Sequence, residues 1–505
     1  MEHAFAVLPD LIASHAAAAP QRLALQHQLE RLTYGELDAK MDQVAAALQR
    51  DGVRKGEAIA ICGLSSLAYA LVFLGALRAG VAAAPLAPSS TPQQLLAMLA
   101  DCAAPLVFLD AASQEALSAL PLPARAIGLD DGGFAAWLAP AGQRPNPVEM
   151  AGADPFNIIY SSGTTGAPKG IVQSHAMRSA HISRAGAFGY DAEAVTLIST
   201  PLYSNTTLVS FLPALAGGGA VVLMEKFDAL RFLELAQSAH ATHAMLVPVQ
   251  YRRLLEHPQF DEFDLSSFRM KFCTSAPFSA ALKADVLRRW PGGLIEYFGM
   301  TEGGGTCILL AHLYPEKLHT VGQPAPGHDI RLIDEEGVEV PRGETGEIVG
   351  RSDAMMLGYR NQPGLTSQAL WRSPQGQDFI RTGDMGRFDA EGFLTLMDRK
   401  KDMIISGGFN IYPSDLEAVL LLHPNVAEAA VVGAASAQWG ETPMAFVSLK
   451  PGAQEEAEAI RAFANGQLGK VQRIAELQIV EALPRSPIGK VLKRELRDKL
   501  AGKEG

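Results

Sequence analysis

One run of the sequence, residues 160–170, reads Tyr160-Ser161-Ser162-Gly163-Thr164-Thr165-Gly166-Ala167-Pro168-Lys169-Gly170. It holds three glycines, four Ser/Thr hydroxyls and one lysine within eleven residues. Apolar, β-prone residues 156–160 precede it and favour a buried strand, and Ile171-Val172 after it indicate the start of another. Backbone N–H groups and hydroxyls in such a loop suit a polyanion, and glycine lets the backbone approach closely. With the positive charge of Lys169, the run predicts a polyphosphate site.

The run differs from the two familiar phosphate-binding patterns. A P-loop reads G-x-x-x-x-G-K-[ST], but here Pro168 precedes Lys169 and Gly170 stands where Ser or Thr belongs. The run does not fit the dinucleotide pattern G-x-G-x-x-G either. A flexible surface linker is the plain structural alternative, yet a linker needs neither a lysine nor paired threonines. We therefore expect a phosphate loop of another kind.

Composition narrows the classes of protein. The 505 residues are 48% hydrophobic and 19% charged, which is typical of a globular enzyme with more than one domain. A net charge of −11 disfavours a nucleic-acid partner. The four cysteines are far apart without a CxxC pair, which argues against a disulfide framework or a zinc site and fits a reducing cytoplasm.

The sequence gives no sign of membrane insertion. The N-terminus lacks a basic region followed by an apolar core, so no signal peptide is evident. The most apolar stretch, residues 68–88, contains Arg78 and fits a buried helix and strand better than a membrane span. We expect a cytoplasmic protein without stable membrane insertion. A homodimer is compatible with the sequence, which does not give the oligomeric state.

The first 150 residues alternate between strand-like and helix-like segments. Strands are expected at 58–62, 81–84 and 106–109, and helices at 33–50, 66–78 and 92–100, with Thr33 as an N-cap. Such βαβ alternation predicts parallel sheets covered by helices. Residues 120–147 are rich in Pro, Ala and Gly and are expected to be irregular. From Lys400 onward the pattern indicates a separate, smaller α+β unit.

Further motifs follow the loop in a fixed order. Thr274-Ser275-Ala276-Pro277 ends an expected strand, and Tyr297-Phe298-Gly299-Met300-Thr301-Glu302 begins twenty positions after Pro277. Gly303-Gly304-Gly305 follows at once. Later runs are Gly343–Ile348, Met356–Tyr359, Arg381-Thr382-Gly383-Asp384, Asp398-Arg399-Lys400-Lys401-Asp402, Ser406-Gly407-Gly408-Phe409-Asn410 and Leu483–Lys490.

The loop and these motifs, in this order, resemble the adenylate-forming enzymes: acyl-CoA synthetases, aryl-CoA ligases, luciferases and the adenylation domains of peptide synthetases. The resemblance covers nearly the whole chain. It implies two half-reactions, in which a carboxylate attacks ATP to give acyl-AMP and pyrophosphate, and a thiol such as coenzyme A then displaces AMP. It also implies an α/β fold with a large N-terminal domain, residues 1–398, and a small mobile C-terminal α+β domain, residues 399–505, hinged at Asp398.

The resemblance implies a set of ATP and metal contacts. Thr301 would donate to the α-phosphate, Glu302 would bind Mg²⁺, and Asp384 would accept the ribose hydroxyls. Asp384 as a turn-capping residue is its structural alternative. Lys490 would be the catalytic lysine that neutralises charge during adenylation. The full ATP-binding set is Ser161, Ser162, Gly163, Thr164, Thr165, Gly166, Lys169, Ser275, Ala276, Pro277, Tyr297, Phe298, Gly299, Thr301, Asp384 and Arg399, in which Phe298 stands where relatives more often carry Tyr.

The resemblance also implies an acyl pocket and a face for the thiol. The pocket residues would be Ser204, Asn205, Thr274, Gly303, Gly304 and Gly305. Relatives often carry His at the position of Ser204, so Ser204 is either a small gate or a plain helix N-cap. The glycine run either leaves space for a bulky tail or forms a flexible turn, and residues 274–277 have a generic strand-to-helix turn as their alternative. Ser406, Gly407, Gly408 and Phe409 would form the coenzyme A access face, and residues 343–348 and 356–359 would be architectural.

The acid and its acceptor are the least constrained part. The expected pocket segments, residues 204–205, 274–277 and 303–307, contain no arginine or lysine for a second carboxylate and no aspartate beside Ser204 for an amino group. We therefore expect an uncharged tail that is aromatic, alicyclic or medium-chain. Two other functions stay open: an enzyme that stops at acyl-AMP or delivers to a carrier protein, and a non-catalytic ATP- or acyl-binding regulator. Lys490, Glu302 and Asp384 together argue against the regulator, because a binder needs no catalytic lysine.

Overall fold

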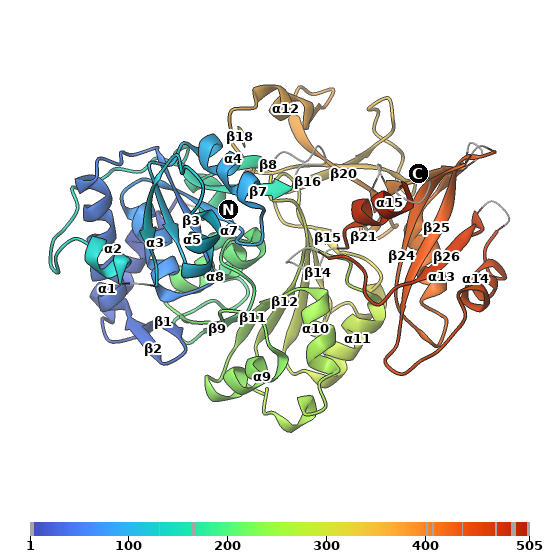
Figure 1. Ribbon diagram of the computed structural model, residues 1–505, viewed down its shortest axis with the longest axis horizontal. Helices are drawn as coiled ribbons and strands as arrows, with labels where there is room; N and C mark the ends of the chain where they lie inside the picture. The colour runs from blue at the N-terminus through green and yellow to red at the C-terminus, as the bar shows by residue number, and fades with distance from the viewer. Residues whose placement is uncertain are drawn as a thin grey trace. The chain divides into compact units, whose positions relative to one another are not determined.

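The computed structural model describes residues 5–130, 132–162, 168–399, 402–406, 409–436, 438–469, 472–485 and 491–501 (Figure 1). Contacts divide the chain into two compact units, Met1–Ile330 with Gly350–Ile380, and Arg331–Val349 with Arg381–Gly505. The chain passes between the units within β16 (Asp329–Ile333), β17 (Gly346–Arg351) and β20 (Asp378–Phe388). The boundary expected between residues 398 and 399 stays a prediction.

The larger sheet of the first unit is mostly parallel. In spatial order its strands are β15 (Gln323–Pro324), β14 (Cys307–Leu310), β13 (Gly293–Phe298), β12 (Met270–Cys273), β11 (His243–Leu246), β9 (Val195–Ile198), β10 (Ala220–Leu223), β1 (Leu23–His27) and β2 (Glu30–Thr33). The strands from β13 to β1 pair in parallel, and antiparallel pairs β1–β2, β13–β14 and β14–β15 lie at the two ends. The buried runs of Val, Ile and Leu in these strands are typical of a sheet covered on both faces.

A second sheet of the same unit carries the segment that precedes and follows the predicted phosphate loop. Its spatial order is β18 (Gly358–Tyr359), β8 (Pro168–Ser174), β7 (Pro155–Ser162), β4 (Ala82–Leu86), β3 (Ala58–Cys62), β5 (Leu106–Leu109) and β6 (Arg125–Gly128). Strands β3, β4 and β5 match the strands expected from the sequence and pair in parallel, which confirms the expected α/β class. Strands β7 and β8 pair antiparallel.

Helices cover both sheets, and several lie between them. The helices of the first unit are α1 (Leu8–Ala18), α2 (Tyr34–Arg50), α3 (Leu67–Arg78), α4 (Pro92–Cys102), α5 (Ala111–Leu117), α6 (Gly133–Trp137), α7 (His175–Gly186), α8 (Asn205–Ala216), α9 (Ala229–Ser238), α10 (Pro248–Leu255), α11 (Ala280–Arg289) and α12 (Pro363–Gln368), with short 3₁₀ turns Phe260–Glu262 and Pro315–Lys317. Helix α7 contacts β7 and β8 of the second sheet and packs on α8, which contacts β9, β10 and β11 of the first. Side chains on α7 are therefore deeply placed.

Local signals in the sequence explain where these helices begin. Thr33 caps α2 as expected: its hydroxyl accepts from the backbone N–H of Glu36, whose carboxylate accepts from the backbone N–H of Thr33. Ser66 caps α3 by accepting from the backbone N–H of Tyr69. Helix α3 is buried along nearly its whole length, which agrees with the expectation of a buried helix rather than a membrane span. Within the described residues no helix has the length and apolar character to cross a membrane.

One expectation about the fold is wrong. Residues 120–147 were expected to be irregular, yet they contain β6 and α6. Strand β6 is held because it adds to β5 in parallel at the edge of the sheet. Helix α6 is held because Trp137 packs edge-on to Phe108 of β5, with ring centroids 4.9 Å apart. Tertiary packing thus overrides a composition that favours turns.

The second unit contains a smaller mixed sheet with its own core. Its spatial order is β23 (Phe409–Ile411), β22 (Ile404–Ser406), β25 (Gly440–Leu449) and β24 (Val426–Ser436), with β26 (Glu476–Ile479) paired to β25. Its helices are α13 (Pro413–Leu420), α14 (Ala457–Asn465) and α15 (Lys493–Ala501). Buried residues such as Ile404, Leu416, Val431, Ala445 and Ile460 form one core cluster. A further sheet joins β16, β17, β20 and β19 (Leu370–Arg372), with β21 (Leu394–Arg399) paired to β20.

Candidate active site

The predicted phosphate loop connects two strands of one antiparallel hairpin. In the β7–β8 ladder Ser161 lies opposite Lys169 and Ser162 lies opposite Pro168. Lys169 therefore belongs to a strand, and its position is set by the ladder. Predicted ATP-binding residues Gly163, Thr164, Thr165 and Gly166 lie outside the described residues, as does the side chain of Ser162.

A cation, a phenol and a carboxylate lie in a row beside this hairpin. Strand β18 pairs with β8, so Tyr359 lies opposite Ile171. The Lys169 Nζ atom is 5.5 Å from the centroid of the Tyr359 ring, and the Tyr359 hydroxyl donates to Glu302 Oε1 at 2.8 Å. Burial and the nearby Glu302 carboxylate raise the pKa of Tyr359, so it stays a neutral donor. Tyr359 thus contacts both Lys169 of the hairpin and Glu302, the predicted metal ligand.

A buried arginine links the hairpin to the predicted acyl pocket and to Thr301. Arg178 on α7 is 1% exposed. Its Nε donates to Asn157 Oδ1 of β7 at 3.0 Å, and its Nη2 donates to Asn205 Oδ1 at 2.9 Å and to the Gln173 amide oxygen of β8. Gln173 Nε2 in turn donates to the carbonyl oxygen of Thr301 at 2.6 Å. The two hairpin strands, the first residue of α8 and the Thr301 backbone therefore share one hydrogen-bond network.

The turn from β12 to α11 is conformationally strained. Ser275 has a φ of 81°, in the left-handed region that non-glycine residues rarely adopt. Its hydroxyl shares a hydrogen bond with the Thr206 hydroxyl of α8, and the Thr274 hydroxyl donates to the carbonyl oxygen of Tyr297 at 2.9 Å. Such outliers gather at functional sites because the surroundings over-determine them. This geometry supports a functional turn over a generic one.

Tyr297 and Phe298 point to opposite faces of the sheet. Successive side chains of a strand alternate. Glu296 on β13 pairs with Lys283 of α11, whereas the Tyr297 ring stacks on Phe272 at 5.8 Å and lies 6.3 Å from the Phe188 ring beyond α7. Phe298 therefore points to the α11 side. Contact of both rings with one adenine stays a prediction that this alternation disfavours.

The glycine run 303–305 does not leave open space. A Cβ at Gly303 would overlap the carbonyl oxygen of Ala354. One at Gly304 would lie 2.7 Å from the carbonyl oxygen of Gly350, and one at Gly305 would lie 2.6 Å from Ile330 Cγ1. Glycine is required here because other parts of the protein fill the volume. The inference that the run makes room for a bulky tail is therefore wrong.

Ser204 sits at the N-cap position of α8, but its side chain makes no capping hydrogen bond. The residue is buried, with 9% of its surface exposed. Of the two interpretations, a capping side chain is not seen. The small-gate role stays a prediction.

In the second unit the two predicted ribose ligands face each other. Asp384 of β20 and Arg399 of β21 are ladder partners. The turn also fixes the backbone of Asp384, because its N–H donates to the Thr382 hydroxyl at 3.0 Å. The side chains of Arg399 and the predicted hinge Asp398 are outside the described residues.

The other predicted residues of this unit are only partly described. Ser406 of β22 and Phe409 of β23 are partners in the ladder between these strands. The Phe409 side chain lies outside the described residues. Gly407, Gly408 and the predicted catalytic residue Lys490 lie outside them altogether.

The metal prediction is compatible with a single protein carboxylate. Among the residues that the structure describes, no group of three or more His, Cys, Asp or Glu could hold a metal ion. Mg²⁺ is usually bound through one or two carboxylates together with substrate phosphates and water. Glu302 fits this coordination preference, and phosphate oxygens of a nucleotide would supply remaining ligands.

Sequence reasoning did not single out three polar residues: Tyr359 and Arg178, described above, and Arg184, which donates to His328 Nε2 at 2.7 Å. Tyr359 falls in a run expected to be architectural, and Arg178 and Arg184 fall in a helix that no motif covers. A signal for the arginines was present, because Arg178, His181 and Arg184 recur every third residue and so share one helix face. Nothing in the sequence indicates that β18 would add to the edge of the hairpin.

Comparisons with known proteins find similar sequences and structures over nearly the whole chain. The model of the AMP-binding enzyme family matches residues 12–360, and that of the AMP-binding enzyme C-terminal domain matches residues 415–490. The fatty acid–[acyl-carrier-protein] ligase ScoC of Streptomyces coeruleorubidus is 32% identical over 500 residues, covering 97% of this chain and 95% of the relative. The indoleacetate–CoA ligase of Aromatoleum aromaticum is 31% identical over 517 residues, covering 98% of each. The ATP-bound structure of MatB from Rhodopseudomonas palustris matches with a TM-score of 0.89 at 28% identity, covering 97% of this chain and 98% of that one.

Proposed function

The chain belongs to the AMP-binding enzyme family and is an AMP-forming acid–thiol ligase, and on this premise we propose how its residues divide the work. A carboxylic acid reacts with Mg-ATP to give acyl-AMP and pyrophosphate, and coenzyme A then takes the acyl group. In the first step a carboxylate oxygen forms a bond to the α-phosphorus and the bond to pyrophosphate breaks. In the second, the thiol sulfur bonds to the acyl carbon and AMP leaves.

The observation that carries this proposal is the row of Lys169, Tyr359 and Glu302 beside the β7–β8 hairpin. Adenylation brings two anions together, and preorganised positive groups and donors offset their repulsion. Lys169 would hold a phosphate oxygen, Thr301 would donate to the α-phosphate, and Glu302 would hold Mg²⁺, which supplies further charge neutralisation when bound. Tyr359 would keep the Glu302 carboxylate oriented. Lys490 would neutralise the attacking carboxylate, and Asp384 and Arg399 would bind the ribose.

The skeleton of the acid is the finer part of the proposal. We propose an aromatic, alicyclic or medium-chain acid. The support is the aromatic cluster of Phe188, Phe272 and Tyr297, whose rings lie 5.8–6.3 Å apart beside α7 and of which Phe188 and Tyr297 are partly exposed. Aromatic faces accept flat rings and alkyl chains alike.

Transfer to a carrier protein is the second candidate for the thiol step. The observation that favours it is the 32% identity to ScoC, which is named a fatty acid–[acyl-carrier-protein] ligase. The thiol of a carrier protein and that of coenzyme A react in the same way with acyl-AMP. The acceptor therefore has to be found by experiment.

AMP release from ATP tests both candidates. The assay takes a panel of carboxylic acids, each with and without coenzyme A. AMP that forms with one class of acid only in the presence of coenzyme A supports the ligase as proposed. Acyl-AMP that accumulates whether or not coenzyme A is present would transfer the second step to another acceptor, and a carrier protein would be tested next. Absence of AMP and of pyrophosphate exchange with every acid would overturn the proposed reaction.

A further inference from the structure

One face of helix α7 carries basic residues inside the first unit. Arg178, His181 and Arg184 follow one another at intervals of three, so they stack along one face of the helix. Arg184 Nη1 lies 2.7 Å from His328 Nε2, and the charges of Arg178 and Arg184 act on His181, so these four groups are neighbours. Helix α7 lies between the two sheets, which places this basic cluster (Arg178, His181, Arg184 and His328) within the protein.

Among the described residues, no carboxylate pairs with either arginine of the cluster. Arg178 hydrogen-bonds to the amide oxygens of Asn157, Gln173 and Asn205. Arg184 donates from Nη1 to His328 Nε2 at 2.7 Å and is half-buried, so it is more accessible than the buried Arg178. Burial without a counter-ion lowers the pKa of both arginines. Two desolvated cations with no acid beside them favour binding of an anion.

The histidines of the cluster do not add to its charge at neutral pH. Burial and the neighbouring arginines lower the pKa of His181 well below its usual value. The same causes lower the pKa of His328 to about 4. Both imidazoles are therefore neutral near pH 7. His328 is hydrogen-bonded to Arg184, whereas His181 Nδ1 is buried with no hydrogen-bond partner among the described residues. The positive charge belongs to the arginines, and the accessible one is Arg184.

Tyr297 adds a hydrogen-bond donor beside Arg184. The Tyr297 ring lies 6.3 Å from the ring of Phe188, which follows Arg184 by four residues. Burial raises the pKa of Tyr297 while the charge of Arg184 acts in the opposite direction. Within the described part of the chain, no hydrogen bond involves the Tyr297 hydroxyl. The ring itself is fixed between Phe188 and Phe272. A neutral phenol next to a guanidinium offers an anion a second donor at a defined position.

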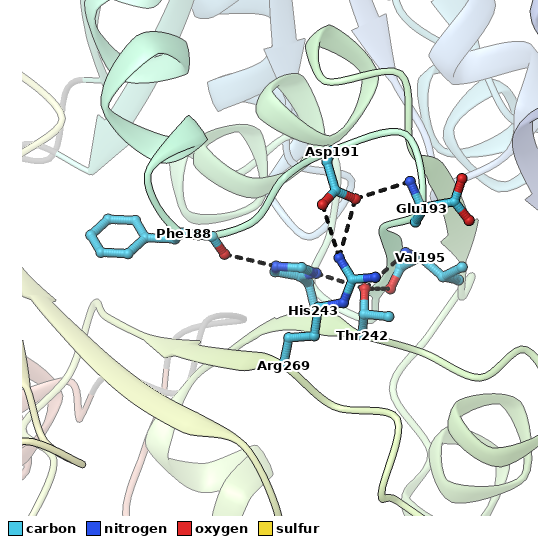
Figure 2. A network of polar contacts seen from close by, with 7 residues as sticks. All are labelled: Phe188, Asp191, Glu193, Val195, Thr242, His243 and Arg269. Atoms are coloured by element: carbon cyan, nitrogen blue, oxygen red, sulfur yellow. Dashed lines mark hydrogen bonds and ion pairs between the residues drawn. The ribbon is translucent and has the colours of Figure 1, made fainter.

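The segment that follows α7 is tied to the sheet, which fixes this arrangement. Figure 2 shows His243 of β11 donating from Nε2 to the carbonyl oxygen of Phe188 at 2.9 Å, with Thr242 at its other ring nitrogen. Figure 2 also shows Asp191 paired with Arg269 at 3.0 Å. Phe188 and the C-terminal end of α7 are therefore anchored before any ligand binds.

The cluster also touches the predicted acyl pocket. His328 contacts the backbone N–H of Thr306, the residue after the glycine run, at 2.9 Å. The Thr274 hydroxyl binds the backbone of Tyr297 itself. Arg178 binds Asn205, the first residue of α8. Two of the segments expected to contact the acyl group thus meet this cluster and a third meets Tyr297, although these segments contain no cation themselves.

We propose that Arg184 and the Tyr297 hydroxyl form a subsite for a second carboxylate on the tail of the acid. This inference rests on the proposed function, since the tail belongs to the acid that is adenylated. A guanidinium matches a carboxylate in a two-pronged geometry, and the phenol supplies a third hydrogen bond. A tail without such a group leaves a desolvated cation unpaired, which selects against it. The substrate class is therefore a dicarboxylic acid with a ring or a chain of medium length.

Matched pairs of acids test the subsite in the intact enzyme. Benzoate is compared with terephthalate, cyclohexanecarboxylate with its 1,4-diacid, and hexanoate with hexanedioate, by kcat/KM for AMP release. We expect the wild type to prefer the diacid of at least one pair by about 100-fold or more, because a site built around a polar group rejects analogues that lack it. R184M removes the charge at nearly constant length, and we expect the preference to vanish or invert. Y297F removes one donor, and we expect the preference to fall about tenfold.

A matched control uses Arg231 of α9, whose side chain is 55% exposed and pairs with Glu234 on the surface. R231M should keep the diacid preference. Because the readout is a ratio measured within one variant, a uniform loss of activity does not affect it. Should R184M fail to fold, R184Q and Y297F provide the same comparison.

The outcomes separate the subsite from the proposed reaction. If AMP is released but the monoacid is preferred in every pair, the proposed carboxylate subsite is wrong and the proposed ligase reaction is unaffected. Failure of all acids to release AMP overturns the ligase. An unchanged diacid preference in R184M, with weaker ATP binding for every acid, would assign the anion to the nucleotide phosphates and overturn the inference.

Discussion

The Tyr359 hydroxyl donates to a carboxylate oxygen of Glu302 across 2.8 Å, although the two residues are 57 positions apart in the chain. The contact exists because β18 adds to the edge of the β7–β8 hairpin. It gives the predicted magnesium ligand a fixed orientation and places the same ring under the hairpin lysine.

Y359F tests whether that orientation matters for adenylation. A hydrogen bond to a charged group is worth about 1.5–3 kcal/mol, so we expect kcat/KM for ATP to fall about 10- to 100-fold. Pyrophosphate exchange measured across a range of Mg²⁺ concentrations should also show a higher Mg²⁺ requirement. Y314F, at a tyrosine that is 36% exposed, is the control. Wild-type exchange and Mg²⁺ dependence in Y359F would contradict the role.

G303A tests whether the glycine run is filled by protein. Its new methyl group would overlap the Ala354 carbonyl oxygen, and the residue would be held at a φ of 79°. We expect a loss of about 2–4 kcal/mol in the free energy of unfolding, measured with urea. Gly364 on α12 has nothing within 4 Å of an added Cβ, so G364A should be close to neutral. Equal stability of the two variants would show that the run has free space after all.

K283M tests the buried ion pair behind strand β13. Lys283 pairs with Glu296 and donates to the carbonyl oxygens of Leu318 and Thr320 at 2.8 and 3.0 Å. Burial raises the pKa of Glu296 to about 7, and Lys283 holds it from rising further. Removing the lysine leaves a buried acid unpaired, and we expect a loss of about 3–5 kcal/mol in urea unfolding. The double variant K283M/E296L should recover part of this, and no recovery would contradict the ion-pair explanation.

Stability should depend on pH through buried histidines. Burial lowers the pKa of His175, which is 3% exposed, to about 4. Between its unfolded value of about 6.5 and pH 4 the unfolded chain binds a proton that the folded chain does not, so stability rises with pH in that window and is lost as pH falls. At pH 5 this one residue costs about 2 kcal/mol. H175Q should flatten the decline in urea stability between pH 7 and pH 5, and the exposed-site variant H240Q should leave it as in the wild type.

K490A separates the two half-reactions. Lys490 is predicted to neutralise charge in the adenylation step only. We expect the variant to lose pyrophosphate exchange while still forming thioester from supplied acyl-AMP and coenzyme A. Equal loss of both reactions would remove Lys490 from its predicted role.

The sequence predicts the regular parts of this fold better than its edges. Strands such as Ala58–Cys62 and helices such as Leu67–Arg78 follow from apolar runs and caps, which are local signals. Strand Arg125–Gly128 was missed because its stability comes from pairing with β5 and not from its own composition. The α/β class could be inferred from the alternation of strands and helices, and the family from the order of the motifs.

The candidate site shows the same division. Glu302 and Lys169 are recognisable because they belong to contiguous motifs. Tyr359 and Arg184 reach the site through an added edge strand and through a helix between two sheets, and no local pattern indicates either contact. The prediction that the glycine run leaves room for a bulky tail failed because a missing side chain does not show which neighbour occupies its place.

The register of the β7–β8 hairpin has a consequence for how such an enzyme can change. Lys169 lies opposite Ser161 in the ladder, so the five residues 163–167 can differ without moving the lysine. Changes in loop length alter closure entropy only slowly, whereas a one-residue slip of the strand would turn the lysine to the other face. The ladder, rather than the loop, thus fixes the position of the lysine. A change in the length or sequence of the loop would therefore act on phosphate binding through the loop residues themselves, while the ladder preserves the position of the cation.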